Sequence, residues 1–91
     1  MSAVLTATAL PHQPRAAIML AEALSVLPVS IWTLYGWRRT RRVDWLTRVG
    51  PDGHQGRDLW INVAAATVWW RSRGLYSVAT GLELIAEGRG R

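Results

Sequence analysis

Pro28 interrupts the longest apolar stretch of this chain, which covers residues 16–37 and is followed at once by a run of arginines. As one helix, this stretch would be about 33 Å long and would resemble a membrane span with a positive flank. A proline inside a helix removes a hydrogen bond and clashes with the preceding turn. Glu22 would also have to enter lipid, which is unfavourable. We therefore expect two short helices with a turn at Pro28, and a single-span membrane protein is the alternative.

The segment before Pro28 has the spacing of an amphipathic helix. Pro14 can occupy its first turn, where a missing amide hydrogen has no consequence. The apolar positions that would share one face are Ala17, Leu20, Leu24 and Leu27. This spacing predicts a first helix whose apolar side faces the core.

The segment after Pro28 predicts a second helix, from Ile31 to about Thr40. Ser30 is a suitable N-cap residue, because its hydroxyl can accept a hydrogen bond from the amide of the third residue that follows. Leu34 and Trp37 would then point toward the core. Two short helices separated by a tight turn form a helix-turn-helix pattern.

Residues 43–61 predict a β-hairpin. In "VDWLTRV" at 43–49, Val43, Trp45, Thr47 and Val49 alternate with Asp44, Leu46 and Arg48, which favours a strand. A second short strand is expected at "RDLWI", residues 57–61. The connecting "GPDGHQG" consists almost entirely of residues that favour turns. The hairpin would follow the second helix directly.

Two further helices are expected after the hairpin. Asn62 can cap a third helix, "VAAATVWWRSR", which would end at Gly74. Its inward positions would be Val63, Ala66, Thr67 and Trp70. Ser77 can cap a fourth helix. The apolar stripe of that helix would consist of Leu75, Val78, Leu82 and Ile85.

Positive charge is concentrated in the middle of the chain. Six arginines lie between residues 38 and 57, where the only acidic residues are Asp44 and Asp52. These arginines are Arg38, Arg39, Arg41, Arg42, Arg48 and Arg57. A clustered basic surface indicates a polyanionic partner, either nucleic acid or anionic lipid, and a solvated basic loop is the alternative. Arginine suits phosphate because its planar guanidinium group can bind two oxygens at once.

The order of these motifs resembles the winged helix-turn-helix domains of the MerR type. The order also resembles that of phage excisionases and of the N-terminal domains of phage small terminase subunits, which look to use the same small fold. The resemblance rests on "LAEAL" at 20–24, "VSIWTLYGW" at 29–37 and "RVGPDGHQGRDLW" at 48–60, followed by "INVAAATVWW". It implies a mostly α fold with a small β-hairpin. The winged helix-turn-helix would occupy residues 15–74, after a flexible arm at 1–14 and before a C-terminal helix and basic tail at 75–91.

The resemblance also implies which residues would contact DNA. On the second helix these are Ser30, Trp32, Thr33 and Tyr35, beside Ile31 and Gly36. The helix end and the first wing strand would contribute Arg38, Arg39, Arg41 and Arg42, and the wing would contribute Arg48, His54, Gln55 and Arg57. Because the groove-facing positions are mostly apolar, we expect binding through phosphate contacts and DNA shape more than through base readout.

The function implied is that of a non-enzymatic, cytoplasmic, double-stranded DNA-binding protein, either an excisionase-like architectural factor or a small transcriptional regulator. A second copy of the chain and an integrase are candidate further partners. The chain has no cysteine, no pair of neighbouring histidines and no cluster of carboxylates, so we expect no metal, no cofactor and no catalytic residue.

The six tryptophans leave a second function class open. Trp37, Trp60 and Trp70 fall on faces predicted to point inward. Trp32 and Trp69 do not, and with Tyr35 they could form the contact surface of a protein-interaction module. The arginines would then meet an acidic protein surface.

Overall fold

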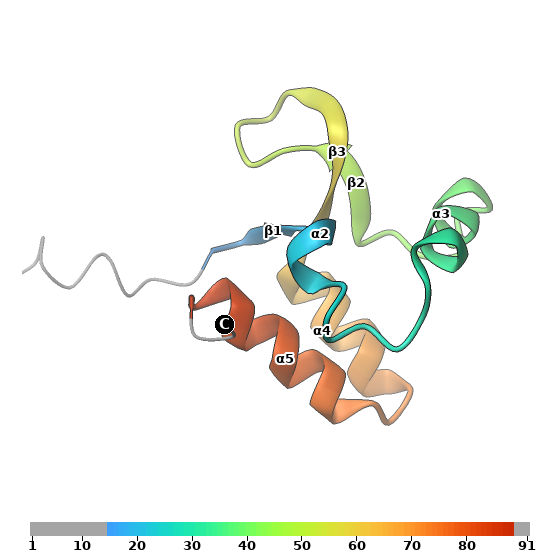
Figure 1. The fold of residues 1–91 in the computed structure, drawn as a ribbon, viewed down its shortest axis with the longest axis vertical. Coiled ribbons are helices and arrows are strands. Elements are labelled where there is room, and N and C mark those ends of the chain that lie inside the picture. The colour runs from blue at the N-terminus through green and yellow to red at the C-terminus, as the bar shows by residue number, and fades with distance from the viewer. Residues whose placement is uncertain (1–14, 89–91) are drawn as a thin grey trace, which may run out of the picture.

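The computed structural model describes residues 15–88. The predicted N-terminal arm, residues 1–14, and the last residues of the predicted basic tail, 89–91, lie outside this range. The described part is a small α/β protein with four helices and a three-stranded antiparallel sheet (Figure 1). In chain order its elements are β1 (Ala17–Met19), α2 (Leu20–Ala23), α3 (Ile31–Arg39), β2 (Leu46–Val49), β3 (Gln55–Asn62), α4 (Val63–Ser72) and α5 (Tyr76–Ala86).

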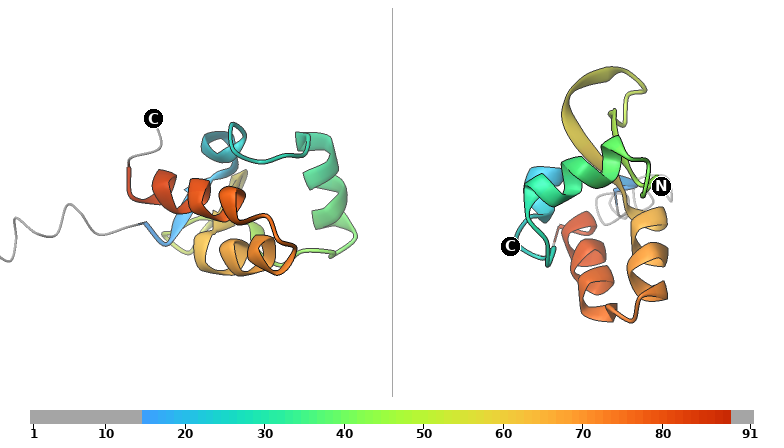
Figure 2. Two further views of the ribbon diagram at one scale, coloured as in Figure 1. Left: turned by 90° about the horizontal axis from the view of Figure 1, so that it is seen from below. Right: turned by 90° about the vertical axis from the view of Figure 1, so that its right-hand side faces the viewer.

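The predicted hairpin is confirmed as β2 and β3, but the sheet is larger than a hairpin. β3 lies in the centre and pairs with β2 on one side and with β1 on the other. The β2–β3 register shifts between Thr47 and Val49, and an irregularity of this kind bends a strand. The hairpin projects away from α4 and α5 (Figures 1 and 2).

The prediction of a single first helix between Pro14 and Pro28 is wrong. Residues 17–19 form β1, and α2 contains only four residues. Ile18 pairs with Ile61 of β3 and is completely buried. This non-local pairing overrides the weak local preference for helix. Leu24 was expected in the core but is 37% exposed, and Ala23 is buried in its place.

The second helix is confirmed as α3. The Ser30 Oγ atom accepts a hydrogen bond from the amide of Thr33 at 3.2 Å, as the N-cap prediction required. Leu34 is completely buried, whereas Trp37 is only partly buried. Because α2 ends at Ala23 and α3 begins at Ile31, residues 16–37 do not form one rod. Over residues 15–88 there is no helix with both the length and the apolar character needed to cross a membrane.

The last two helices form an antiparallel pair below the sheet (Figure 2). The Asn62 cap is confirmed, since its Oδ1 atom accepts a hydrogen bond from the amide of Ala65 at 3.1 Å. All four predicted inward positions of α4 are buried. Ser77 is not the cap of α5, which begins one residue earlier, after Leu75, without a side-chain cap. Leu75 is exposed, but the other three positions of the predicted stripe are buried in the same core as α4.

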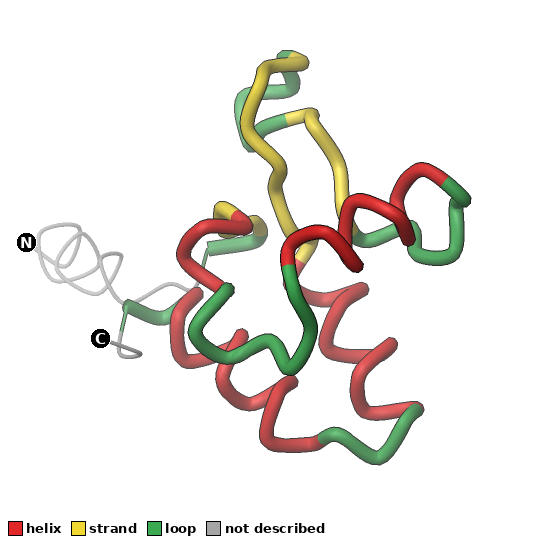
Figure 3. The backbone as a smooth tube through the Cα atoms, turned by 45° about the vertical axis from the view of Figure 1, so that its right-hand side comes forward, coloured by secondary structure: helices red, strands yellow, loops and turns green. Residues whose placement is uncertain are grey.

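Four tryptophans attach α3 to α4. The ring centroids of Trp37 and Trp69 lie 5.3 Å apart, and those of Trp69 and Trp70 lie 4.8 Å apart. Trp45, from the loop before β2, packs against both α4 tryptophans and is completely buried. Aromatic pairs at these separations stabilise packing beyond the area that they bury. The cluster therefore holds α3 in place beside the hairpin, where Figure 3 shows it connected by two loops.

Candidate nucleic-acid interface

α3 and β2 share a shallow cleft of about 600 Å³ on one side of the molecule. The residues that line it are Trp32, Tyr35, Gly36, Arg38, Arg39 and Arg48. Five of these six belong to the residues that the sequence predicted to contact DNA. Three arginines from two separate elements thus line one cleft.

Arg48 is held in place across the hairpin. Its Nη1 atom donates a hydrogen bond to the carbonyl of Arg57, on the neighbouring strand. Arg48 and Arg38 are half-buried, whereas Arg39 is exposed at the end of α3. A charged group that is already oriented loses less conformational entropy on binding than a free arginine does.

The C-terminus of α3 has an unusual backbone. The amide of Arg42 donates to the carbonyl of Trp37 at 2.8 Å, and the amide of Arg41 donates to the carbonyl of Arg38 at 3.1 Å. These two bonds define a Schellman motif. In this motif the residue directly after the helix C-cap has a left-handed backbone and is usually glycine. Here Arg41 occupies it with a φ of 58°, a conformation that costs a non-glycine residue about 1 kcal/mol.

Arg42 and Arg73 flank the tryptophan cluster. The guanidinium carbon of Arg42 lies 5.6 Å from the Trp37 ring centroid, and that of Arg73 lies 3.6 Å from the Trp69 ring centroid. Trp37 and Trp69 contact each other, so the two arginines border one aromatic surface. Sequence reasoning missed Arg73, although its spacing of four residues from Trp69 is the spacing at which helical side chains meet.

The hairpin tip is separate from the cleft. His54 and Gln55 border a different depression, together with residues 50–52. The Nδ1 atom of His54 lies 3.3 Å from a carboxylate oxygen of Asp52, and both side chains are exposed. Gly53 completes this turn with a φ of 83°. The structure therefore does not bring the tip residues to the cleft of α3 and β2.

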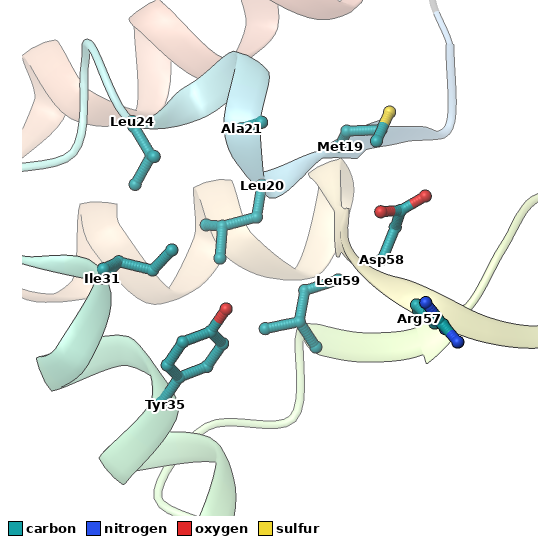
Figure 4. A pocket seen from close by; sticks show the side chains of 9 residues that line it. All are labelled: Met19, Leu20, Ala21, Leu24, Ile31, Tyr35, Arg57, Asp58 and Leu59. Carbon is teal, nitrogen blue, oxygen red and sulfur yellow. The ribbon is translucent and has the colours of Figure 1, made fainter.

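Two of the predicted contact residues, Ser30 and Thr33, form the N-cap interaction of α3. The hydroxyl oxygens of Ser30 and Thr33 lie 3.1 Å apart, and the Ser30 hydroxyl also accepts from the Thr33 amide. Tyr35 is partly engaged as well. Figure 4 shows its hydroxyl directed into a small pocket between α2, α3 and β3, toward Leu20 and Leu59.

Arg57 borders this same pocket beside Asp58 (Figure 4). It does not line the cleft of Arg38, Arg39 and Arg48, although its carbonyl accepts the hydrogen bond from Arg48. Trp32 remains as the most exposed aromatic side chain of α3, at 77%. Its ring meets Tyr35 edge to face, with centroids 5.9 Å apart.

Two arginines outside positions 38–57 form ion pairs. Arg15 pairs with Glu22 at 3.0 Å, and Arg71 pairs with Glu83 at 2.7 Å. Within residues 15–88, none of the six arginines between positions 38 and 57 forms an ion pair. Their charge is available to a polyanion without first breaking an internal pair.

In the described part of the chain, no three histidine, aspartate or glutamate side chains gather in a way that could hold a metal ion. The chain matches no family model, no curated protein and no solved structure at a significant level. A function for this surface therefore has to be inferred from its geometry and charge.

Proposed function

We propose that this protein binds double-stranded DNA, without catalysis, as a small winged helix-turn-helix protein. α2 and α3 are the two helices of the motif, and the β2–β3 hairpin is the wing. The observation that carries the proposal is the cleft between α3 and β2. There Arg38, Arg39 and Arg48 converge without an acidic partner among residues 15–88.

The arrangement of the elements supports a docking geometry. α3 stands at the side of the molecule (Figure 1), where it can approach the major groove while the hairpin reaches the adjacent backbone or minor groove. The arginines at the end of α3 would then contact phosphates. Because α3 offers few polar groups to base edges, most of the affinity would come from phosphate contacts and DNA shape. An excisionase-like architectural factor or a small regulator in the bacterial cytoplasm fits this chemistry, with several copies side by side on DNA.

The proposal is tested by titrating a random-sequence duplex with the protein across a series of salt concentrations. If four or five arginines neutralise phosphates, the logarithm of the binding constant falls with the logarithm of salt concentration with a slope of about −4. Arg38→Ala combined with Arg39→Ala should weaken binding to every duplex and flatten this slope by about 2.

The matched control is Arg15→Ala combined with Arg71→Ala, which removes the same charge from two ion-paired arginines. The control should retain the slope of the unaltered protein. An unchanged slope in the Arg38/Arg39 variant, or an equal change in the control, would contradict the proposed contact surface.

The second candidate function is a protein-interaction module, and the exposure of Trp32 favours it. Trp69 supports it less, because it is half-buried within the tryptophan cluster. A folded protein that binds no duplex even at low salt would favour this alternative, with the arginines facing an acidic protein.

A further inference from the structure

We propose that the exposed aromatic side of α3 recognises the C5-methyl groups of thymine in the major groove. This inference rests on the proposed function and names the sequence preference that the same surface would have. It begins from what α3 lacks. Between Ile31 and Arg39 there is no Asn, Gln, Asp or Glu, and the one hydroxyl of its first turn, on Thr33, already faces the Ser30 cap.

Trp32 is the principal group that α3 presents to a partner. It is 77% exposed, and its ring rests against the edge of Tyr35 rather than in the core. It borders the cleft that also holds three arginines. A large apolar side chain beside guanidinium groups suits a ligand that offers both an apolar group and anionic groups at short range.

Gly36 leaves open space beside Trp32. It lies one turn further along α3, and a Cβ atom built there would meet nothing within 4 Å. A glycine inside a helix destabilises it by about 0.5–1 kcal/mol relative to alanine. Gly36 lines the same cleft as Trp32, Tyr35 and the arginines, so a small apolar group can approach the helix there.

Thymine methyl is the apolar group that base pairs present in the major groove. It lies among phosphates that the cleft arginines could contact, so one DNA segment offers both chemistries that the cleft combines. Burying one methyl group strengthens binding about fourfold, from the usual transfer free energy of a methylene-sized group.

The experiment compares alternating A·T duplexes with A·U duplexes, which keep the phosphates and the hydrogen-bonding edges but lack the methyl group. The unaltered protein should bind the A·T duplex about fourfold more tightly for each methyl group buried. The Trp32→Ala variant should lose this preference and bind both duplexes with the same affinity. The matched control is Tyr76→Ala, which removes an aromatic side chain on α5 that is 64% exposed, and it should keep the full preference.

Two further arms complete the test. G·C duplexes that carry 5-methylcytosine should bind more tightly than unmethylated ones, because the same methyl position is restored. Gly36→Ala should reduce the thymine preference while leaving the protein folded.

The outcomes separate the inference from the proposed function. Salt-dependent binding that is equal for A·T and A·U duplexes would overturn the methyl contact and leave DNA binding intact. The inference is also overturned if Trp32→Ala weakens binding to both duplexes by the same factor, so that the preference for A·T remains. It is likewise overturned if the substitution alters only self-association of the protein. An absence of duplex binding would remove both the inference and the proposed function.

Discussion

One residue of α3 and one in the turn that follows it occupy positions where local conformational preferences favour a different residue type. Gly36 lies inside the helix, where alanine is favoured, and Arg41 has the left-handed backbone that glycine favours after a helix end. Neither choice is explained by internal packing: a Cβ at Gly36 would meet open space, and Arg41 is exposed and forms no ion pair within residues 15–88. Unfavourable local conformations of this kind concentrate at functional sites, which agrees with the proposed role of α3.

Arg41→Gly should therefore stabilise the fold and weaken DNA binding in the same variant. Relief of the left-handed backbone should raise the free energy of unfolding by about 1 kcal/mol, measured by urea denaturation. Loss of one phosphate contact should flatten the salt slope of duplex binding by about 1.

The control for this prediction is Arg39→Gly, which places the same substitution at the last residue of α3. It should lower the free energy of unfolding by up to about 1 kcal/mol, because glycine disfavours a helix. Equal stability changes in the two variants would contradict the interpretation of the Arg41 backbone.

At the scale of elements, the sequence predicted those parts whose signals are local. Ser30 and Asn62 cap α3 and α4 as expected, because an N-cap requires only a side chain and an amide three residues later. The hairpin followed from its turn residues. Of the predicted contact residues, Trp32 and three arginines line one cleft, whereas the tip residue His54 lies beside Asp52 and outside that cleft.

The elements that were missed depend on distant contacts. β1 exists because residues 17–19 pair with β3, more than forty positions away, and the periodicity of a short segment contains no information about such a partner. Two further contacts likewise depend on how α3 packs near α4: Arg73 lies over the Trp69 ring, and Trp45 packs within the tryptophan cluster.

The strand assignment of residues 17–19 predicts a reversed order of two substitutions. Ile18 is completely buried in the sheet, whereas Leu24 is 37% exposed. Ile18→Ala should lower the free energy of unfolding by about 2–4 kcal/mol, because it leaves a cavity in the core. Leu24→Ala should change it by less than about 1 kcal/mol. Urea denaturation of both variants measures the difference. A larger loss of unfolding free energy for Leu24→Ala than for Ile18→Ala would contradict the strand and support the helix that the sequence predicted.

At the scale of the whole molecule, the ion-paired arginines and most of the unpaired arginines lie on different elements. Arg15 and Arg71 are paired with glutamates on α2 and α5. The arginines between positions 38 and 57, on α3, the following loop and the hairpin, are not paired among residues 15–88. The paired arginines join elements of the fold, while the unpaired ones raise the local electrostatic potential, which accelerates encounter with a polyanion.

Salt should consequently change stability and binding in opposite directions. Repulsion among the unpaired arginines destabilises the free protein, and potassium chloride screens it, with a Debye length of about 10 Å at 0.1 M. The melting temperature of the free protein should rise with salt, while affinity for duplex falls. The two ion pairs act against this rise, but exposed pairs contribute only about 0–1 kcal/mol each.

The variants of the binding experiment test the origin of this effect. Arg38→Ala combined with Arg39→Ala should make the melting temperature less dependent on salt, because two of the repelling charges are gone. Arg15→Ala combined with Arg71→Ala should make it more dependent, because the opposing ion pairs are gone. A melting temperature that falls with salt in the unaltered protein would show that attraction dominates its surface. The unpaired arginines would then not form the repulsive cluster on which DNA binding is proposed to depend.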